Sequence, residues 1–299
     1  MWPELLHSIQ QGDIKSLSRC ISFIENESAG YETLLESIHN TKRCQVIGIT
    51  GAPGTGKSTL TDALVGALNN DEKKIAVLCV DPSSPFNMGA LLGDRIRMSD
   101  WYNHSNVFIR SLATRGSLGG LHPKIIEITD LVKSAGFDYI IIETVGVGQS
   151  EIEIAGLADT TLVVLTPDSG DEIQTMKSGL MEIADIFVVN KSDKPNADVL
   201  VKNLKSMMSL PVQHHKDIPV LKTIASHKEG ISELKTQILE HPTSGNLEKR
   251  VWLTTAKAFQ LIQKHRMKDI DKVKLHQEIL EKGFTNFNLY RFVKSYLDK

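Results

Sequence analysis

A glycine-rich segment near residue 50 has the residue types and spacing of a phosphate-binding loop. Residues 51–59 read GAPGTGKST and match the pattern G-x-x-x-x-G-K-[ST], with an apolar run before it and a helical pattern after it. Glycines let backbone N–H groups turn inward around a phosphate, and the start of a helix favours the same anion. We expect Lys57 to lie between the β- and γ-phosphates and the Ser58 hydroxyl to bind Mg²⁺. The predicted nucleotide contacts are Gly51, Ala52, Pro53, Gly54, Thr55, Gly56, Lys57, Ser58 and Thr59.

A four-residue segment after a later apolar run indicates which base is recognised. Residues 190–193 read NKSD and directly follow the strand-like run 186–189. A carboxylate at Asp193 only accepts hydrogen bonds, which suits the N1–H and 2-amino donors of guanine, a donor pair that adenine lacks. We therefore expect Asn190, Lys191 and Asp193 to bind guanine, while a turn closed by a capping aspartate is the structural alternative.

Three acidic residues are candidates for binding Mg²⁺ and for placing the attacking water. Asp81 and Glu143 each end a strand-like run, and Asp94 lies in a glycine-interrupted stretch farther along from Asp81. Carboxylates at the carboxyl ends of strands face the ligand crevice of an open α/β sheet. Together with Ser58 these acids form the predicted metal site, in which Glu143 binds the ion directly, binds it through water, or orients the attacking water. Surface acids in helix-capping ion pairs are the alternative.

Alternating strand-like and helix-like segments must position these residues. Apolar runs of strand length begin near positions 44, 74, 107, 139, 161, 186 and 220, and helical patterns separate most of them. This order predicts an α/β fold of the P-loop NTPase type, with a mainly parallel sheet and helices on both faces. We expect an N-terminal helical extension over residues 1–41, the P-loop GTPase domain over 42–228 and a C-terminal helical arm over 229–299.

The composition is that of an ordinary globular protein. Hydrophobic residues make up 41% of the chain and the formal net charge is −2, so we expect no nucleic-acid partner and no membrane partner. The three cysteines, Cys20, Cys44 and Cys79, are far apart and form no metal-ligand motif, which favours a reducing compartment. With neither a basic leader nor a run of membrane-spanning length, we expect a cytoplasmic protein.

Several longer strings, taken in order, resemble one family of GTPases. The chain is similar to the MeaB/ArgK family, which belongs to the SIMIBI class of P-loop GTPases and accompanies adenosylcobalamin-dependent acyl-CoA mutases. The resemblance covers residues 44–195 densely and the flanking helices more loosely. After GAPGTGKST, the strings that carry it are DPSSPFNMGALLGDRIRM, ATRGSLGGL, ETVGVGQSE, SGDEIQTMKSG and NKSD.

The resemblance implies a role and further site residues. It implies a Mg²⁺-dependent GTPase that binds GTP and GDP, acts as a chaperone of a mutase of the methylmalonyl-CoA type, gates cofactor loading and protects the enzyme. By matching positions, Gln149 joins Lys57 and the three acids in serving phosphate, Mg²⁺ and water. A third switch matches the segment from Asp168 to Gly179, where Gln174 and Lys177 would sense the partner. The family's C-terminal helices form a homodimer, so dimerisation is expected here.

Three other functions stay open at this point. A kinase or ATPase linked to lysine, arginine and ornithine transport, an older label of this family, would need a second pocket and a phosphorylated product. A GTPase that delivers nickel would need a cluster of Cys and His residues. A nucleotide-dependent scaffold would keep binding its partner after hydrolysis is blocked at Glu143.

Overall fold

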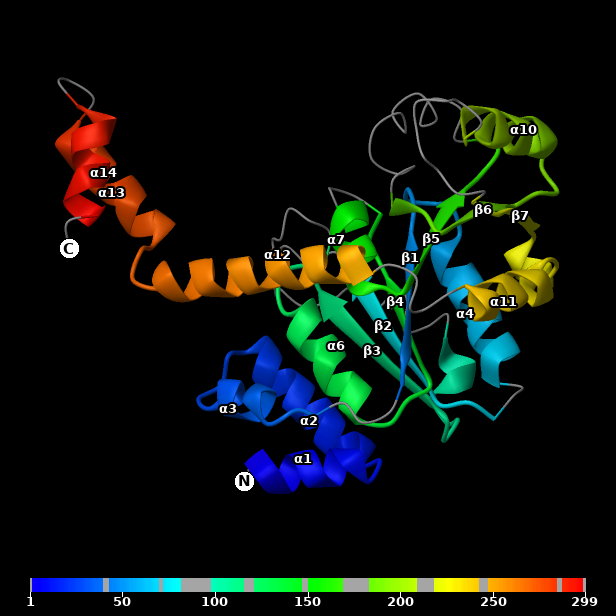
Figure 1. Cartoon of the computed structure of the whole chain (residues 1–299), viewed down its shortest axis with the longest axis horizontal. Coiled ribbons are helices and arrows are strands. Elements are labelled where there is room, and N and C mark those ends of the chain that lie inside the picture. The colour runs from blue at the N-terminus through cyan, green and yellow to red at the C-terminus, as the bar shows by residue number, and fades with distance from the viewer. Residues whose placement is uncertain are drawn as a thin grey trace. The chain divides into compact units, whose positions relative to one another are not determined.

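The computed structural model divides the chain into two compact units, Met1–Gly245 and Asn246–Lys299. Each unit is considered separately below, and Figure 1 shows the elements of both. The structure describes residues 2–39, 43–69, 72–81, 98–115, 121–146, 150–168, 183–208, 218–241, 247–283 and 287–297.

The first unit is built on a parallel sheet. Its seven described strands lie in the order β3-β2-β4-β1-β5-β6-β7, and every neighbouring pair is parallel. This arrangement confirms the predicted α/β fold, because parallel strands need the crossover helices that the sequence pattern indicates. The strands are β1 (Gln45–Thr50), β2 (Ile75–Asp81), β3 (Val107–Ala113), β4 (Tyr139–Glu143), β5 (Thr160–Leu165), β6 (Ile186–Asn190) and β7 (Val220–Thr223).

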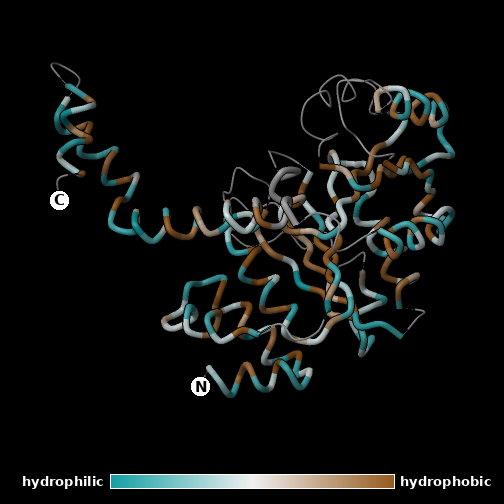
Figure 2. The backbone as a smooth tube through the Cα atoms, in the orientation of Figure 1, coloured by the Kyte–Doolittle hydropathy of each residue, from teal (hydrophilic) through white to brown (hydrophobic). Residues whose placement is uncertain are grey.

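Helices cover both faces of this sheet. Side chains alternate along each strand, so that Val46 of β1 faces one apolar core while Ile47 and Ile49 face another. Figure 2 shows hydrophobic colour concentrated along the strands and on the inner sides of the helices. One face carries α4 (Lys57–Asn69) and α11 (Ile231–Glu240), and the other carries α6 (Ile125–Ser134), α7 (Ser150–Leu157) and α10 (Ala197–Met208).

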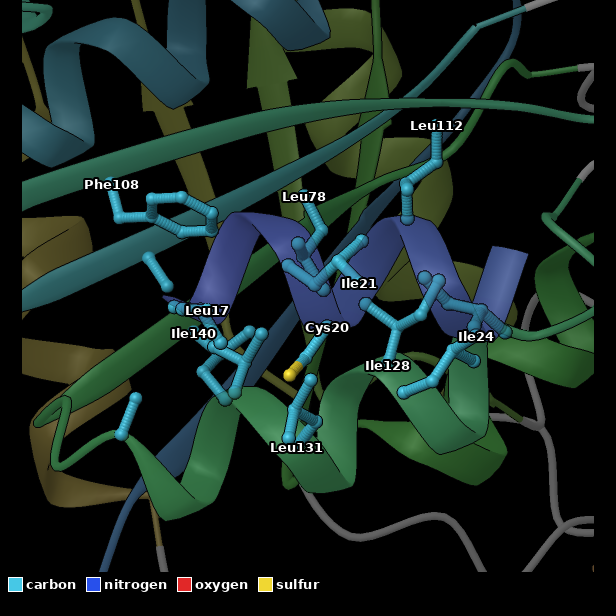
Figure 3. Close-up of a cluster of buried hydrophobic side chains, with 14 of the residues drawn as sticks. Leu17, Cys20, Ile21, Ile24, Leu78, Phe108, Leu112, Ile128, Leu131 and Ile140 are labelled. Carbon is cyan, nitrogen blue, oxygen red and sulfur yellow. The ribbon is translucent and has the colours of Figure 1, made fainter. Parts of the chain in front are cut away.

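The N-terminal helices belong to the same core. Helices α1 (Trp2–Gln10), α2 (Ile14–Glu25) and α3 (Tyr31–Glu36) precede the sheet, and the Asp13 side chain caps α2 by accepting from two backbone N–H groups. In Figure 3 the side chains of α2 point towards β2, β3, β4 and α6. The buried residues shared by these elements are Leu17, Cys20, Ile21, Ile24, Leu78, Phe108, Leu112, Ile128, Leu131 and Ile140.

Both ends of the first unit differ from the predicted domain boundaries. The sequence placed residues 1–41 outside the P-loop domain, but α2 buries its apolar face against the sheet. The sequence also ended the domain at 228, whereas Ile231, Leu234 and Ile238 of α11 pack in the core that contains α4. The unit therefore runs to Gly245, because an apolar helix face needs a partner surface and the sheet supplies it.

The second unit is helical. It contains α12 (Leu247–Arg266), α13 (Lys272–Lys282) and α14 (Leu289–Leu297). The Tyr296 hydroxyl donates to Glu278 at 2.6 Å, and the Phe292 ring packs against Phe287 and Tyr296, so α13 and α14 form a small hairpin. Among the described helices of the chain, none is both long enough and apolar enough to span a membrane.

Candidate functional site

The predicted phosphate loop joins β1 to α4. Lys57 and Ser58 begin α4 and are buried, and the Lys57 Nζ donates to the carbonyl oxygens of Gly51 at 2.8 Å and Ala52 at 3.1 Å. Gly51 has a φ of 144°, and a methyl group on its Cα would lie 2.2 Å from the carbonyl oxygen of Val164. Glycine is therefore required at position 51, since any side chain would collide with the backbone of β5.

Gly146, three residues after β4, lies against this loop. Its φ is +86°, and a methyl group on its Cα would lie 2.4 Å from the Gly51 carbonyl oxygen and 2.5 Å from the Lys57 Nζ. The chain after β4 therefore approaches the lysine that is predicted to hold the phosphates. A side chain at Gly146 would compete for that position, which is the physical reason for a glycine here.

Glu143 is held by two hydroxyl groups of α4. The Ser58 Oγ donates to Glu143 Oε1 at 2.6 Å, and the Thr61 Oγ1 lies 2.9 Å from Glu143 Oε2. All three residues are buried, with Glu143 only 3% exposed. The structure thus brings the predicted metal ligand Ser58 together with the predicted acid Glu143. Sequence reasoning missed Thr61, which has the appearance of an ordinary helix residue.

Asp81 ends the neighbouring strand. Strands β2 and β4 pair in parallel with Cys79 opposite Glu143, so Asp81 and Glu143 both lie at the carboxyl edge of the sheet. Asp81 is 5% exposed, and its carbonyl oxygen accepts from the backbone N–H of Thr114 at 3.0 Å. The other predicted residues for water and partner sensing, Asp94, Gln149, Gln174 and Lys177, lie outside the described residues.

The side-chain oxygen atoms at the carboxyl edge of the sheet suit a hard cation. Mg²⁺ prefers oxygen ligands and is usually bound through one or two carboxylates together with substrate phosphates. Ser58, Asp81 and Glu143 offer one hydroxyl and two carboxylates at the carboxyl edge of the sheet. The residues present therefore fit the predicted ion.

The predicted guanine segment begins at the last residue of β6 and contacts the phosphate loop. The Asn190 side-chain amide is buried and donates to the Thr55 carbonyl oxygen at 2.9 Å, while its Oδ1 accepts from the Thr223 hydroxyl and the Ala225 N–H, each at 3.1 Å. The Lys191 Nζ donates to the Gly54 carbonyl oxygen at 2.7 Å.

The side chains of the guanine segment differ in what they contact. Asn190 and Lys191 tie the segment to the phosphate loop, whereas the Asp193 carboxylate is exposed. The contact between Asp193 and the guanine base stays a prediction from the sequence. Lys194 forms an ion pair with Asp168, the residue at which the predicted third switch begins.

A second polar cluster lies where α2 ends beside β3 and α6. Arg110 pairs with Glu25, and Arg115 donates to the Glu25 carbonyl oxygen at 2.5 Å. Lys124 donates to the Tyr31 hydroxyl at 2.8 Å and pairs with Glu27 and Glu127. We call this group the Glu25 cluster; its members are Glu25, Glu27, Tyr31, Arg110, Arg115, His122, Lys124 and Glu127.

His122 is the titratable centre of that cluster. Its Nδ1 accepts from the Lys124 backbone N–H at 3.0 Å, which leaves the ring proton on Nε2, 3.9 Å from a Glu25 carboxylate oxygen. Burial lowers the pKa of His122 to about 4, and the positive charges of Arg115, Lys124 and Arg110 act in the same direction. The imidazole is therefore neutral in the folded protein at pH 7.

Comparisons with known proteins show the family to which the chain belongs. Residues 17–278 match the sequence profile of the family described as methylmalonyl Co-A mutase-associated GTPase MeaB. The GTPase ArgK of Escherichia coli is 32% identical over 98% of this chain and 89% of its own length. A protein of Pyrococcus horikoshii is 42% identical over 80% of this chain and 77% of its own length.

Two further matches are a longer fused protein and a solved structure. A fused isobutyryl-CoA mutase of Geobacillus kaustophilus is 34% identical over 88% of this chain, which matches 25% of that longer protein. A solved LAO/AO transport system kinase superposes with a TM-score of 0.71 at 26% identity, over 100% of this chain and 98% of the other. With the phosphate loop and the guanine segment in contact, these similarities identify the chain as a P-loop GTPase that binds guanine nucleotide and belongs to the MeaB family of methylmalonyl-CoA mutase-associated GTPases.

Proposed function

We propose that this chain is a Mg²⁺-dependent GTPase that acts as a chaperone of an adenosylcobalamin-dependent acyl-CoA mutase, gating cofactor loading and protecting the enzyme. The observation that carries the partner assignment is the fused isobutyryl-CoA mutase, in which a segment similar to 88% of this chain shares one polypeptide with a mutase. Fusion holds two modules at a high effective concentration, an arrangement that suits proteins that act on one another.

The hydrolytic step relies on positioning and electrostatics. The backbone N–H groups of the phosphate loop, which Pro53 lacks, and the Lys57 ammonium would hold the β- and γ-phosphates of GTP. Mg²⁺, held by Ser58 with help from Asp81 and Glu143, would neutralise charge on these phosphates. The switch residues Asp94 and Gln149 would place a water in line with the γ-phosphate, and Asp193 would read the guanine base.

The second unit is the proposed dimerisation region. Its longest helix, α12, exposes several large apolar side chains, including Phe259 at 66% and Ile262 at 56%. Apolar side chains that recur on one helix commonly pair with another helix. A homodimer formed through residues 246–299 would cover them, and sedimentation at several protein concentrations tests this.

The first experiment measures GTP and ATP hydrolysis with and without an adenosylcobalamin-dependent acyl-CoA mutase. We expect turnover of GTP only, slow alone and faster with the mutase, because a partner that orders the switch segments completes the site. Equal use of ATP, with a phosphorylated small molecule as product, would instead support the transport kinase named for the similar solved structure.

A variant of Glu143 separates an enzyme from a scaffold. Glu143→Gln should lower the GTP turnover rate by about 100-fold, the size of effect found when one electrostatic group is removed from a hydrolytic site. The matched control is Glu127→Gln, another buried glutamate, which is 8% exposed and pairs with Lys124. A mutase whose protection persists unchanged with Glu143→Gln would indicate a nucleotide-dependent scaffold.

A further inference from the structure

Thr61 has contacts that an ordinary buried helix residue would not need. It lies one helical turn after Lys57 and is fully buried. Its Oγ1 is 2.9 Å from the Lys57 carbonyl oxygen and 2.9 Å from Glu143 Oε2. A hydroxyl has one proton and both neighbours are acceptors, so the two compete for the same hydrogen bond.

The carboxylate is the stronger of the two acceptors. The Lys57 carbonyl already accepts the backbone N–H of Thr61 within α4, because residues four apart are bonded in an α-helix. A hydrogen bond to an ionised group is about twice as strong as a bond between neutral groups. Thr61 therefore gives its proton mainly to Glu143.

Two donors on two oxygens fix the plane of the carboxylate. Ser58 holds Glu143 Oε1 at 2.6 Å and Thr61 holds Oε2 at 2.9 Å, both from the same face of α4. While the Ser58 proton points at Oε1, the hydroxyl oxygen presents its lone pairs in a fixed direction, and lone pairs are what a cation binds. Without Thr61 the carboxylate would lose its hydrogen bond at Oε2, which weakens the restraint on its plane and on the direction of the Ser58 hydroxyl.

We propose that Thr61 is a positioning residue, which orients the Glu143 carboxylate and through it the Ser58 hydroxyl for Mg²⁺ bound with the nucleotide. This inference rests on the proposed Mg²⁺-dependent GTPase function. It adds a residue outside the phosphate-loop motif to the site, and one that acts on the metal through two other side chains.

A matched buried threonine distinguishes positioning from packing. Thr129 in α6 is also fully buried, and its hydroxyl donates to the Ile125 carbonyl oxygen four residues earlier at 2.6 Å. Thr61→Val and Thr129→Val each replace a hydroxyl by a methyl of similar size. If Thr61 only filled space, the two variants should behave alike.

The test measures the affinity of the purified full chain for GDP as a function of Mg²⁺ concentration, together with the melting temperature. We expect Thr61→Val to raise the Mg²⁺ concentration at half-effect about fivefold, the equivalent of one hydrogen bond. Thr61→Ser, which keeps the hydroxyl, should return it to within about twofold of the wild-type value. Thr129→Val should lower the melting temperature without changing the Mg²⁺ midpoint.

Two outcomes would overturn the inference, and they differ. A Thr61→Val midpoint equal to that of the wild type would overturn the positioning role alone and leave the proposed function intact. A wild-type protein whose GDP affinity and GTP hydrolysis ignore Mg²⁺ would overturn both. If Thr61→Val does not fold, Thr61→Ala removes the same hydroxyl with less crowding and is judged by the same midpoint.

Discussion

Glu143 and Glu25 are two largely buried carboxylates of the same unit, and they accept hydrogen bonds from different kinds of donor. Glu143 accepts from the neutral hydroxyls of Ser58 and Thr61 at the carboxyl edge of the sheet. Glu25, with a side chain 11% exposed, pairs with the Arg110 guanidinium and faces the His122 ring at 3.9 Å.

The difference separates a group that responds to a ligand from one that holds the fold. In the Glu25 cluster the protein supplies its own cations, and Arg115 also donates to the carbonyl oxygen of Glu25 at the end of α2. At Glu143, one of the two donors is the hydroxyl predicted to bind Mg²⁺. We therefore expect changes in the Glu25 cluster to alter stability, and changes around Glu143 to alter the response to Mg²⁺ and nucleotide.

The largest expected effect is a pH dependence of stability that comes from His122. Its pKa is about 4 in the folded protein and about 6.5 when unfolded, so the unfolded state binds more protons between these values. The stability that the protein has while His122 is neutral in both states is fully present above pH 6.5, and it is lost as the pH falls towards 4. The shift corresponds to about 3 kcal/mol. Urea unfolding at a series of pH values measures it.

His122→Asn is the control for that pH dependence. The Asn side-chain oxygen can accept from the Lys124 N–H in place of the imidazole Nδ1, and it does not titrate. The variant should lose most of the drop between pH 6.5 and 4, whereas an unchanged drop would assign the effect to the carboxylates. The stabilisation by Mg²⁺ and GDP at pH 7.5 should be the same in both proteins.

The next effect is the loss of the Glu25 charge. Glu25→Gln leaves the Arg110 guanidinium without its anionic partner and should lower the free energy of unfolding by about 2 kcal/mol, as expected for a hydrogen bond to a charged group. The increase in melting temperature caused by Mg²⁺ and GDP should not change. A smaller increase in melting temperature would mean that the Glu25 cluster and the surroundings of Glu143 are coupled, and the two would not have separate roles.

Glu143→Gln, unlike Glu25→Gln, should change the stabilisation that Mg²⁺ and GDP provide. If the amide weakens binding of Mg²⁺ and GDP tenfold, the stabilisation at saturating ligand falls by about 1.4 kcal/mol. Differential scanning fluorimetry with and without Mg²⁺ at fixed GDP concentration measures this difference. The comparison fails if Glu143→Gln and the wild type gain the same stabilisation from Mg²⁺.

The sequence could predict the parts of this molecule that rest on local patterns. Apolar runs followed by helical periods are enough to predict a parallel sheet, and GAPGTGKST and NKSD specify their chemistry by residue type alone. The compact unit extends past the predicted boundary at 228, and the sequence does not show this because an amphipathic pattern at 231–240 is the same whether the helix covers a sheet or belongs to a separate arm.

Contacts between distant residues could not be predicted in this way. Asn190 donates to a carbonyl 135 positions earlier, and Thr61 meets a carboxylate 82 positions later. The Arg110–Glu25 pair spans 85 positions. No local period or motif encodes these pairs, since they follow from the strand order and from the packing of α2 on the sheet.

The smallest expected effect concerns an ion pair at the surface. Lys194 pairs with Asp168, and the two side chains are 40% and 62% exposed. Solvent screens such a pair, so Lys194→Ala should change the free energy of unfolding by less than about 0.5 kcal/mol. The matched control is Lys222→Ala, since Lys222 pairs with Asp198 at side-chain exposures of 50% and 88%. Urea unfolding of both variants checks whether burial, rather than opposite charge alone, makes the Glu25 cluster stabilising.

A loss above about 1 kcal/mol in Lys194→Ala, but not in Lys222→Ala, would exceed what an exposed pair contributes. It would place Asp168 and the guanine segment among the elements that hold the fold.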